Sequence, residues 1–494
     1  MGQMRFRLHE RDRIADGGLQ RIYVAGAEDI PWSTRTAWED DQLVVKRAVD
    51  DSGYVYVPWQ VDGHGQHLLG TTTLMEREKP YLLEVELARG LIQRLRGRLF
   101  IWEWLGLKTP EELVEQLRDA TRLFARAATS QDDMPAAAEA ANQAIASALT
   151  ISDELVRAYA EQTLGNRQRQ TPASTLMGVT LGAQTPPTAV RRQLVDACNI
   201  IQLPVSWRAI ESREGKRDWK ATDEQLGWCQ TAGLKVAAGP LLRLDDRGVP
   251  DWMYLWEGDD DNLVGLLLDH VRAVVSRYTG RVHLWHIASR VNNAQLLSLG
   301  EESRLNLVAQ AVQVVRKIDP RTPTVVSFDQ PWGEYLVDQD HELAPLHYAD
   351  ALLRADLGIS GFGLEINAGY WPRGSTHRPA FEYGRLIDLW SQLGLPLMVF
   401  LSAPDSDADD PQAARNIRAE LVHPTGDAAL NSQLAWAASV APLLLARTSV
   451  QVLLWNQLSD AEPHEFPHGG LFDAKGKAKP ALELLRDLRK TCLA

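Results

Sequence analysis

Cysteine is scarce in this 494-residue chain, which contains only Cys198, Cys229 and Cys492, and no two of them form a CxxC pair. An odd number of widely separated cysteines supports neither a disulfide framework nor a zinc finger. Sparse, unpaired thiols are typical of a reducing compartment. The cysteines therefore favour a cytoplasmic protein without structural disulfides.

Long apolar runs and long basic runs are also missing. No stretch reaches the roughly 18 uncharged apolar residues that a membrane-spanning helix requires. The opening segment MGQMRFRLHERDRIADGG has no apolar centre of the signal-peptide kind, so we expect a cytoplasmic location, or secretion if a leader precedes this numbering. The net charge of -13 argues against sequence-independent binding to nucleic acid. We expect neither a membrane nor a nucleic-acid partner, and the oligomeric state stays open.

The composition is that of a globular protein with more than one domain. The chain is 45% hydrophobic and 24% charged, and its length suggests about two to four domains. Residues 1–105 contain alternating and β-branched runs between turn clusters such as ADGG and DDSG, which predict a β-sandwich-like domain. Residues 106–172 change to helical periodicity and end in the polar segment 165–174, which predicts a helical connector followed by a linker.

Residues 173–494 repeat a pattern of strand, loop and helix. Continuous apolar strands that alternate with amphipathic helices predict a parallel sheet covered on both faces. Eight such units predict an α/β fold, a (β/α)8 TIM barrel. A doubly wound open sheet is the structural alternative, although no GxGxxG follows the first strand. The eight expected strands lie within 175–182, 199–207, 234–242, 282–289, 322–331, 359–367, 395–404 and 450–458.

Several segments of this region occur in an order known from one enzyme family. They include SWRAIESREGKRDW at 206–219, VPDWM at 249–253, YTGRVHLWHIASRVNN at 278–293, ISGFGLEIN at 359–367 and GGLFDAKGKAKPAL at 469–482. Together they resemble glycoside hydrolase family 10, the endoxylanase family of (β/α)8 barrels. The resemblance implies a barrel that holds an oligo- or polysaccharide. It also makes a carbohydrate-binding role conceivable for the N-terminal domain, with a packing role as the alternative.

The resemblance does not extend to the family's catalytic residues. Family members use one glutamate after strand four as acid/base and one after strand seven as nucleophile, with carboxyls about 5 Å apart in retaining enzymes. The first position falls on Arg290 in this chain, and the second falls on Leu401, or on Ser402 if the register slips by one. The resemblance thus implies a divergent, xylanase-like protein without the standard two-glutamate mechanism.

Two other acids lie at expected strand ends. Asp329 ends the fifth strand and Glu365 ends the sixth, and neighbouring strands lie about 4.8 Å apart. Their carboxyls could serve as a relocated catalytic pair, with one raised in pKa by the other. The alternative is that Glu365 forms a structural ion pair with Arg290 or Arg243.

Further residues at strand ends or in the loops beyond them are candidates for sugar contact. Aromatic rings stack on sugar faces, while carbohydrate pockets add a few placed polar groups. Trp371, beside Tyr370 in a turn-rich loop, is the candidate that we expect to be exposed for stacking. The substrate-binding candidates are Trp207, Arg243, Trp252, Arg290, Asn367, Tyr370, Trp371, Trp455 and Asn456.

We expect no cofactor and no bound metal. The acidic run PDSDADDP at 404–411 reads as a solvated loop rather than as a cation site, because its spacing is not that of an EF-hand. His464 and His468 are separated by Pro467 and do not form a helical metal pair.

Three functions remain open on this evidence. The first is a divergent family 10-like protein that binds or processes carbohydrate, the second is an active glycoside hydrolase or transglycosylase using Asp329 and Glu365, and the third is a non-catalytic assembly protein. A mouth blocked by arginine favours the third, and an open mouth with two close carboxyls favours the second. Sugar identity, linkage and anomer are not encoded in these patterns.

Overall fold

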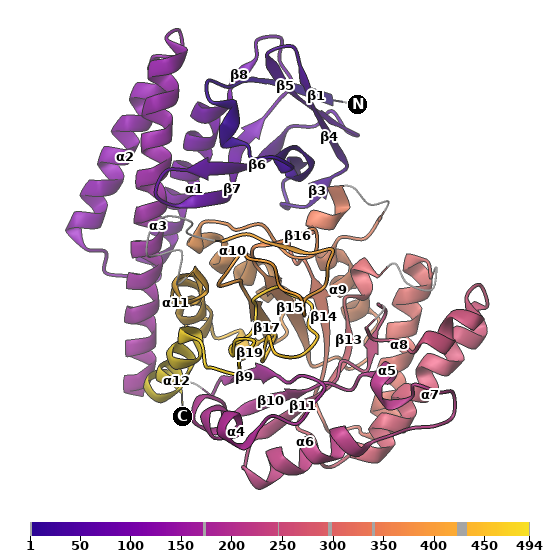
Figure 1. Cartoon of the computed structure of the whole chain (residues 1–494). Helices are drawn as coiled ribbons and strands as arrows, with labels where there is room; N and C mark the ends of the chain where they lie inside the picture. The colour runs from indigo at the N-terminus through magenta and orange to yellow at the C-terminus, as the bar shows by residue number, and fades with distance from the viewer. Residues whose placement is uncertain are drawn as a thin grey trace.

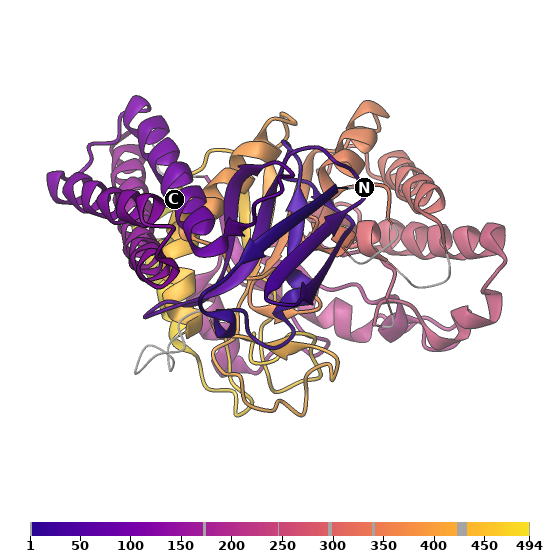
Figure 2. The ribbon, with the colours of Figure 1, turned by 90° about the horizontal axis from the view of Figure 1, so that it is seen from above.

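The computed structural model describes residues 2–170, 174–245, 247–294, 299–337, 341–421 and 432–493. A sheet-rich N-terminal part lies against one side of a barrel, and a group of long helices flanks both (Figure 1). Seen from above, the N-terminal sheets lie over the barrel, with α2 and α3 on one side and α7 and α8 on the other (Figure 2).

The N-terminal part forms two four-stranded sheets whose inward side chains share one hydrophobic core. The strand expected at GYVYVPWQV is present as β6, a long central strand. In sheet order the first sheet is β4 (Thr34–Glu39), β5 (Gln42–Arg47), β1 (Gly2–Arg7) and β8 (Tyr81–Leu82), and the second is β3 (Pro31–Trp32), β2 (Tyr23–Ala25), β6 (Gly53–Val61) and β7 (Gly65–Leu74).

Three long helices follow: α1 (Leu83–Trp104), α2 (Glu111–Thr129) and α3 (Met134–Gln170). The expectation that the β-rich part extends to residue 105 is wrong, because residues 83–104 form α1. The LEVEL sequence at its start alternates like a strand, but packing of α1 on β7 decides in favour of a helix. The expected linker also begins later than predicted, since residues 165–170 continue α3.

The (β/α)8 barrel is confirmed, and each of the eight expected strands is present. All eight pair in parallel, and the ladders between β19 and β9 and between β11 and β13 close the sheet. The closed arrangement rules out the open-sheet alternative. In order around the barrel the strands are β9 (Leu176–Thr180), β10 (Ile200–Leu203), β11 (Lys235–Ala238), β13 (Leu284–Ser289), β14 (Thr324–Asp329), β15 (Gly361–Asn367), β17 (Leu397–Ser402) and β19 (Val450–Trp455).

Helices cover the outside of the barrel. Amphipathic segments such as α8, which begins at two acids and ends before Asp319-Pro320, place their apolar faces on the strands. Short strands β12 (Leu242–Arg243), β16 (Tyr370–Trp371) and β18 (Arg418–Ala419) extend the loops beyond the barrel ends. The helices are α4 (Thr188–Ala197), α5 (Trp207–Ile210), α6 (Lys220–Thr231), α7 (Asp260–Tyr278), α8 (Glu301–Ile318), α9 (Pro345–Arg354), α10 (Ala380–Ser391), α11 (Ser432–Leu445) and α12 (Pro480–Cys492).

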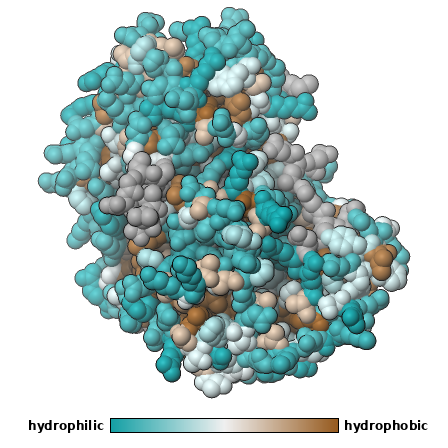
Figure 3. Space-filling model, in the orientation of Figure 1, coloured by the Kyte–Doolittle hydropathy of each residue, from teal (hydrophilic) through white to brown (hydrophobic). Residues whose placement is uncertain are grey.

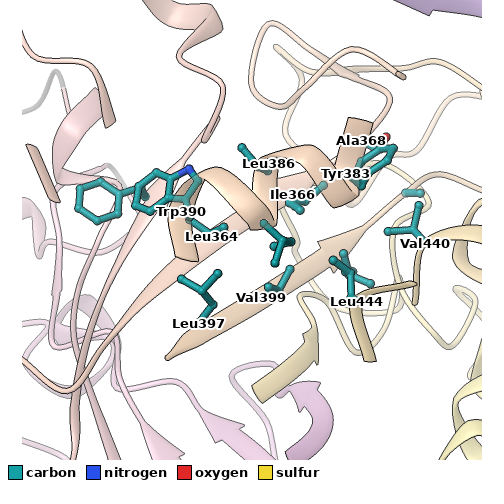
Figure 4. Packing of buried hydrophobic residues seen from close by; sticks show 14 of the residues in the cluster. Leu364, Ile366, Ala368, Tyr383, Leu386, Trp390, Leu397, Val399, Val440 and Leu444 are labelled. Carbon is teal, nitrogen blue, oxygen red and sulfur yellow. The ribbon is translucent and has the colours of Figure 1, made fainter. Parts of the chain in front are cut away.

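Alternation along the strands divides the barrel into two faces. On β15 and β17, residues such as Leu364, Ile366 and Val399 point outward and pack against Trp390 of α10 and residues of α11 (Figure 4). Met398 and Phe400 belong instead to a separate cluster inside the barrel. The residues between the outward ones on β15 therefore face the interior, which places Glu365 and Asn367 toward the barrel mouth.

The outer surface is mostly hydrophilic, with scattered apolar residues, on the face shown in Figure 3. Among the described helices, none combines the length and the apolarity needed to cross a membrane.

Buried arginines join the N-terminal part to the barrel. Arg378, before α10, donates to the Tyr23 hydroxyl of β2 at 2.8 Å and pairs with Glu334 at 3.0 Å. Arg98 of α1 binds Asp388 of α10 at 2.6 Å. Removing one partner of a buried ion pair costs several kcal/mol, so these contacts fix the two parts against each other.

The contact of α1 with β7 makes a testable prediction about two glycines. A Cβ at Gly90 would lie 2.0 Å from the Gly70 carbonyl oxygen, whereas a Cβ at Gly97 of the same helix meets nothing within 4 Å. We expect Gly90→Ala to lower the free energy of unfolding by about 1–3 kcal/mol through overpacking. Gly97→Ala, the matched control, should raise it by up to about 1 kcal/mol through helix propensity. Urea denaturation of the whole chain measures both, and equal effects would contradict the packing described.

Candidate functional site

A cavity of about 190 Å³ opens at the carboxyl ends of the barrel strands. This is the end at which (β/α)8 barrels carry their functional residues. Polar and charged groups from four barrel strands, β9, β10, β13 and β15, and from the loops beyond the strands line it together with prolines and aromatic rings. The polar and charged lining residues include Gln202, Arg243, Arg290, Glu365, Asn456 and Glu465.

Arg290 holds two carboxylates at the centre of this mouth. It follows the last residue of β13 with a left-handed backbone, φ 57°. Its Nε donates to Glu365 Oε2 at 2.6 Å, and its Nη1 donates to Glu465 Oε1 at 2.5 Å. Glu365 and Glu465 are buried and the Arg290 side chain is only 11% exposed. The expected pairing of Glu365 with Arg290 is thus present, and it extends to a second acid.

Arg243 binds the other oxygen of Glu465. The distance from Arg243 Nη2 to Glu465 Oε2 is 2.7 Å, and Arg243 Nε donates to Asp245 at 2.6 Å. Burial disfavours the ionised form of Glu465, but Arg290 and Arg243 outweigh this effect and hold the pKa of Glu465 well below its usual range. Glu465 is therefore a carboxylate at any ordinary pH.

Glu365 Oε1, the oxygen that Arg290 does not bind, accepts the last hydrogen bond of a buried chain. Gln202 Nε2 donates to His286 Nδ1 at 3.0 Å, His286 Nε2 lies 2.8 Å from Ser327 Oγ, and Ser327 Oγ donates to Glu365 Oε1 at 3.0 Å. Burial lowers the pKa of His286 to about 4, so the ring is neutral with its proton on Nε2. The chain fixes the orientation of the Glu365 carboxylate.

Asp329 lies directly beside Glu365, as expected. The two residues are partners in the parallel ladder of β14 and β15. Burial raises the pKa of Asp329 to about 7, with Arg290 acting in the opposite direction and Glu365 adding to the rise. Its Oδ1 has no hydrogen-bond partner among the described residues. Asp329 thus keeps its proton to a higher pH than an exposed aspartate does.

Of the other residues predicted to contact sugar, some lie at the barrel mouth and others lie around it. Asn456 lines the cavity and donates to Asn367 Oδ1 at 2.9 Å. Tyr370 is buried against Phe466, and half-buried Trp371 carries the Arg21 guanidinium over its ring at 5.3 Å. Trp371 is therefore less open than the sequence suggested.

Three tryptophans proposed for sugar contact lie outside the cavity lining. Trp207 is buried, stacks on His270 and donates to Glu211 at 2.9 Å. Trp252 packs edge-on against Trp207. Trp455 points outward from β19 into the helix layer and donates to the Gly469 carbonyl at 2.8 Å. In these positions the rings act in packing.

The structure also distinguishes between Leu401 and Ser402, the two alternatives for the family's nucleophile position. Leu401 faces the hydrophobic layer between strands and helices, not the mouth. Ser402, one residue on, lies 3.5 Å from the Tyr370 hydroxyl on the inward side. The slipped register is thus the one whose side chain faces the barrel interior, and a serine without a base beside it is a poor nucleophile.

The acidic run is solvated at Asp407 and Asp409, as expected, but two of its other acids form ion pairs. The Asp410 side chain is 6% exposed and binds His464 Nε2 at 3.0 Å. Asp405, Asp460 and His468 bring possible metal-ligand atoms within 4.8 Å of one another. The Lys479 ammonium already binds Asp405 at 2.8 Å and Asp460 at 2.6 Å, which fills the centre of this group.

Glu465, Gln202 and Ser327 are site residues that the sequence patterns did not reveal. Glu465 lies in the loop after the eighth strand, between Pro463 and Pro467. Loops of that kind belong to the functional face of a barrel, so its position in sequence carried a signal. Ser327 lies two residues before Asp329 on the same strand face, a relation that alternation alone could have shown.

Comparisons with known proteins agree with this fold. The Glycosyl hydrolase family 10 profile matches residues 192–315. Over 89 residues the chain is 28% identical to Endo-1,4-beta-xylanase C of Paenibacillus barcinonensis, covering 17% of this chain and 8% of that protein. The chain thus matches a small part of that relative's length. The barrel is family 10-like, as the sequence resemblance implied.

Solved xylanase structures are similar to this chain at low sequence identity. Xylanase 10B from Thermotoga petrophila, solved with xylobiose, is 14% identical with a TM-score of 0.48, covering 64% of this chain and 95% of that chain. A family 10 structure from Paenibacillus barcinonensis is 18% identical with a TM-score of 0.49, covering 67% of this chain and 97% of that chain.

The raised pKa of Asp329 predicts a pH-dependent cost to stability. A carboxyl with a pKa near 7 when folded and near 4 when unfolded destabilises the fold progressively as pH rises between those values. We expect wild type to lose roughly 2–3 kcal/mol relative to Asp329→Asn between pH 5 and pH 8. Asp269→Asn, which changes an exposed acid of α7, is the control. The free energy of unfolding is measured by denaturation at each pH. If it changes with pH in the same way for wild type and Asp329→Asn, the buried environment described for Asp329 is contradicted.

Proposed function

We propose that the barrel mouth binds carbohydrate and does not cleave it by the two-glutamate retaining mechanism. The supporting observation is the position of Arg290, whose buried guanidinium pairs with both Glu365 and Glu465. Glu465 is a poor proton donor, because the arginines hold its pKa well below its usual range. It is also a poor nucleophile, because its charge is already compensated.

The cavity wall supports a sugar ligand. Pro204, Pro240 and Phe400 offer apolar surface, while Asn456 and Gln457 offer amide groups. Pockets for carbohydrate combine such surfaces with a small number of directed polar groups. The arginines line this space without filling it, which weakens the case for an assembly protein without a ligand. The family 10 profile match over residues 192–315 supports a carbohydrate ligand.

The test measures binding and turnover in one preparation. Because the curated relative is named a xylanase, xylobiose and xylotetraose are the first probes, followed by a glycan array. We expect saturable binding by calorimetry, no reducing-end release above the blank, and at least a tenfold loss of affinity in Arg290→Met. Arg272→Met, on the exposed face of α7, is the control and should bind like wild type. Rapid hydrolysis by wild type would reject the proposal, and binding of no glycan would favour an assembly role.

A second candidate is an active glycosidase that uses Asp329 and Glu365. The observation in its favour is their side-by-side register together with the pKa of about 7 at Asp329, which suits a general acid. Under this candidate, Asp329→Asn and Glu365→Gln would each reduce turnover by about 100-fold or more. Wild-type turnover would also fall as pH rises above about 7, where Asp329 loses its proton. Unchanged turnover in both variants of a cleaving preparation would reject the relocated pair.

A further inference from the structure

Glu465 is bound in the way that a ligand carboxylate would be. Each of its two oxygens accepts from a different arginine, Oε1 from Arg290 at 2.5 Å and Oε2 from Arg243 at 2.7 Å. Arginines are preferred where a planar carboxylate is bound through both oxygens. The two guanidiniums therefore form a receptor for one carboxylate, and a side chain of the same molecule occupies it.

The backbone on either side of Glu465 is held independently of that carboxylate. The Gln457 side chain donates to the Phe466 carbonyl at 3.1 Å and accepts from the Phe466 amide at 3.2 Å. His464 is held by Asp410 at 3.0 Å. Release of the arginines therefore requires rotation of one side chain and no opening of the loop.

The size of the cavity fits a site that is partly filled. Pockets for small ligands usually measure about 300–1,000 Å³, whereas this one measures about 190 Å³. Glu465, Arg243 and Arg290 are all part of its wall. Rotation of Glu465 away from the arginines would enlarge the space at the point where the positive groups lie.

We propose that the mouth binds an acidic sugar, a uronic acid residue, whose carboxylate replaces Glu465 on Arg243 and Arg290. This inference rests on the proposed carbohydrate function and narrows its ligand class. In the unliganded protein Glu465 accepts from both arginines, and each arginine also keeps a second acid, Glu365 on Arg290 and Asp245 on Arg243. The sugar ring then occupies the neighbouring space beside Asn456 and Phe400.

The test compares ligands that differ in one group. Glucuronate and glucose share a ring and differ in a carboxylate against a hydroxymethyl group, and acetate supplies the carboxylate alone. Binding to wild type, Glu465→Ala and Glu462→Ala is measured by calorimetry at constant ionic strength. We expect Glu465→Ala to bind glucuronate at least tenfold more tightly than wild type does, because the internal competitor is gone. Glucose should bind wild type and Glu465→Ala with the same affinity. Acetate should bind Glu465→Ala more weakly than glucuronate binds it.

Glu462→Ala is the matched control, because it removes an acid from the same cavity wall without vacating the arginines. An equal gain in glucuronate affinity in this variant would show that removing any negative charge near the cavity is sufficient, and it would overturn the proposal. Binding of neutral xylo-oligosaccharides without any preference for glucuronate would overturn the acidic-sugar inference and leave the carbohydrate function standing. If no variant binds any sugar, both the acidic-sugar inference and the proposed carbohydrate function are rejected. Equal affinity for acetate and glucuronate would also overturn the inference, by showing a bare carboxylate site.

Glu465→Gln provides a second route if Glu465→Ala does not fold. The amide keeps the shape of the side chain and loses the charge that makes it a competitor. We expect a gain in glucuronate affinity of the same sign but smaller size, and no gain would count against the proposal.

Discussion

The buried ion pairs of Arg290 determine the arrangement of the barrel mouth. The guanidinium connects Glu365 of the sixth barrel strand to Glu465 of the loop after the eighth, and Arg243 joins the same loop from the third. The two glutamates are buried, so their charges are stable only while the arginine partners are present. The positions of the strand ends, the loop and the hydrogen-bond chain through Ser327 therefore depend on one another.

This arrangement changes what the scaffold can do chemically. In a retaining glycosidase two carboxyls must differ in protonation, one giving a proton and the other attacking. Glu365 and Glu465 are both bound by Arg290, and Arg290 and Arg243 together hold the pKa of Glu465 well below its usual range. Asp329 lies beside Glu365 but is not among the residues that line the cavity, and burial together with the neighbouring Glu365 raises its pKa. A binding site therefore follows more directly from these contacts than a hydrolytic one.

The barrel could be predicted from the sequence because its strands are short, apolar and regularly spaced, and each of the eight was placed correctly. Residues 83–104 were misjudged because the LEVEL alternation is local, whereas the helix is decided by packing on β7. At the site, Asp329 and Glu365 could be paired from strand adjacency alone. Glu465 could not be placed, because the path of a loop between two prolines depends on distant contacts such as Asp410 with His464.

Helix α3 carries a consequence for how the molecule is assembled on the ribosome. Its first half packs on α1 and α2, but Tyr159 accepts from Arg447 at 3.0 Å and Arg167 donates to the Leu445 carbonyl at 2.8 Å. These partners lie at the end of α11, which packs on α3 and is synthesised after most of the barrel. During translation the second half of α3 therefore emerges with an uncovered apolar face. The N-terminal part can fold early, as domains generally do, but it stays incomplete until the last barrel strands have been made.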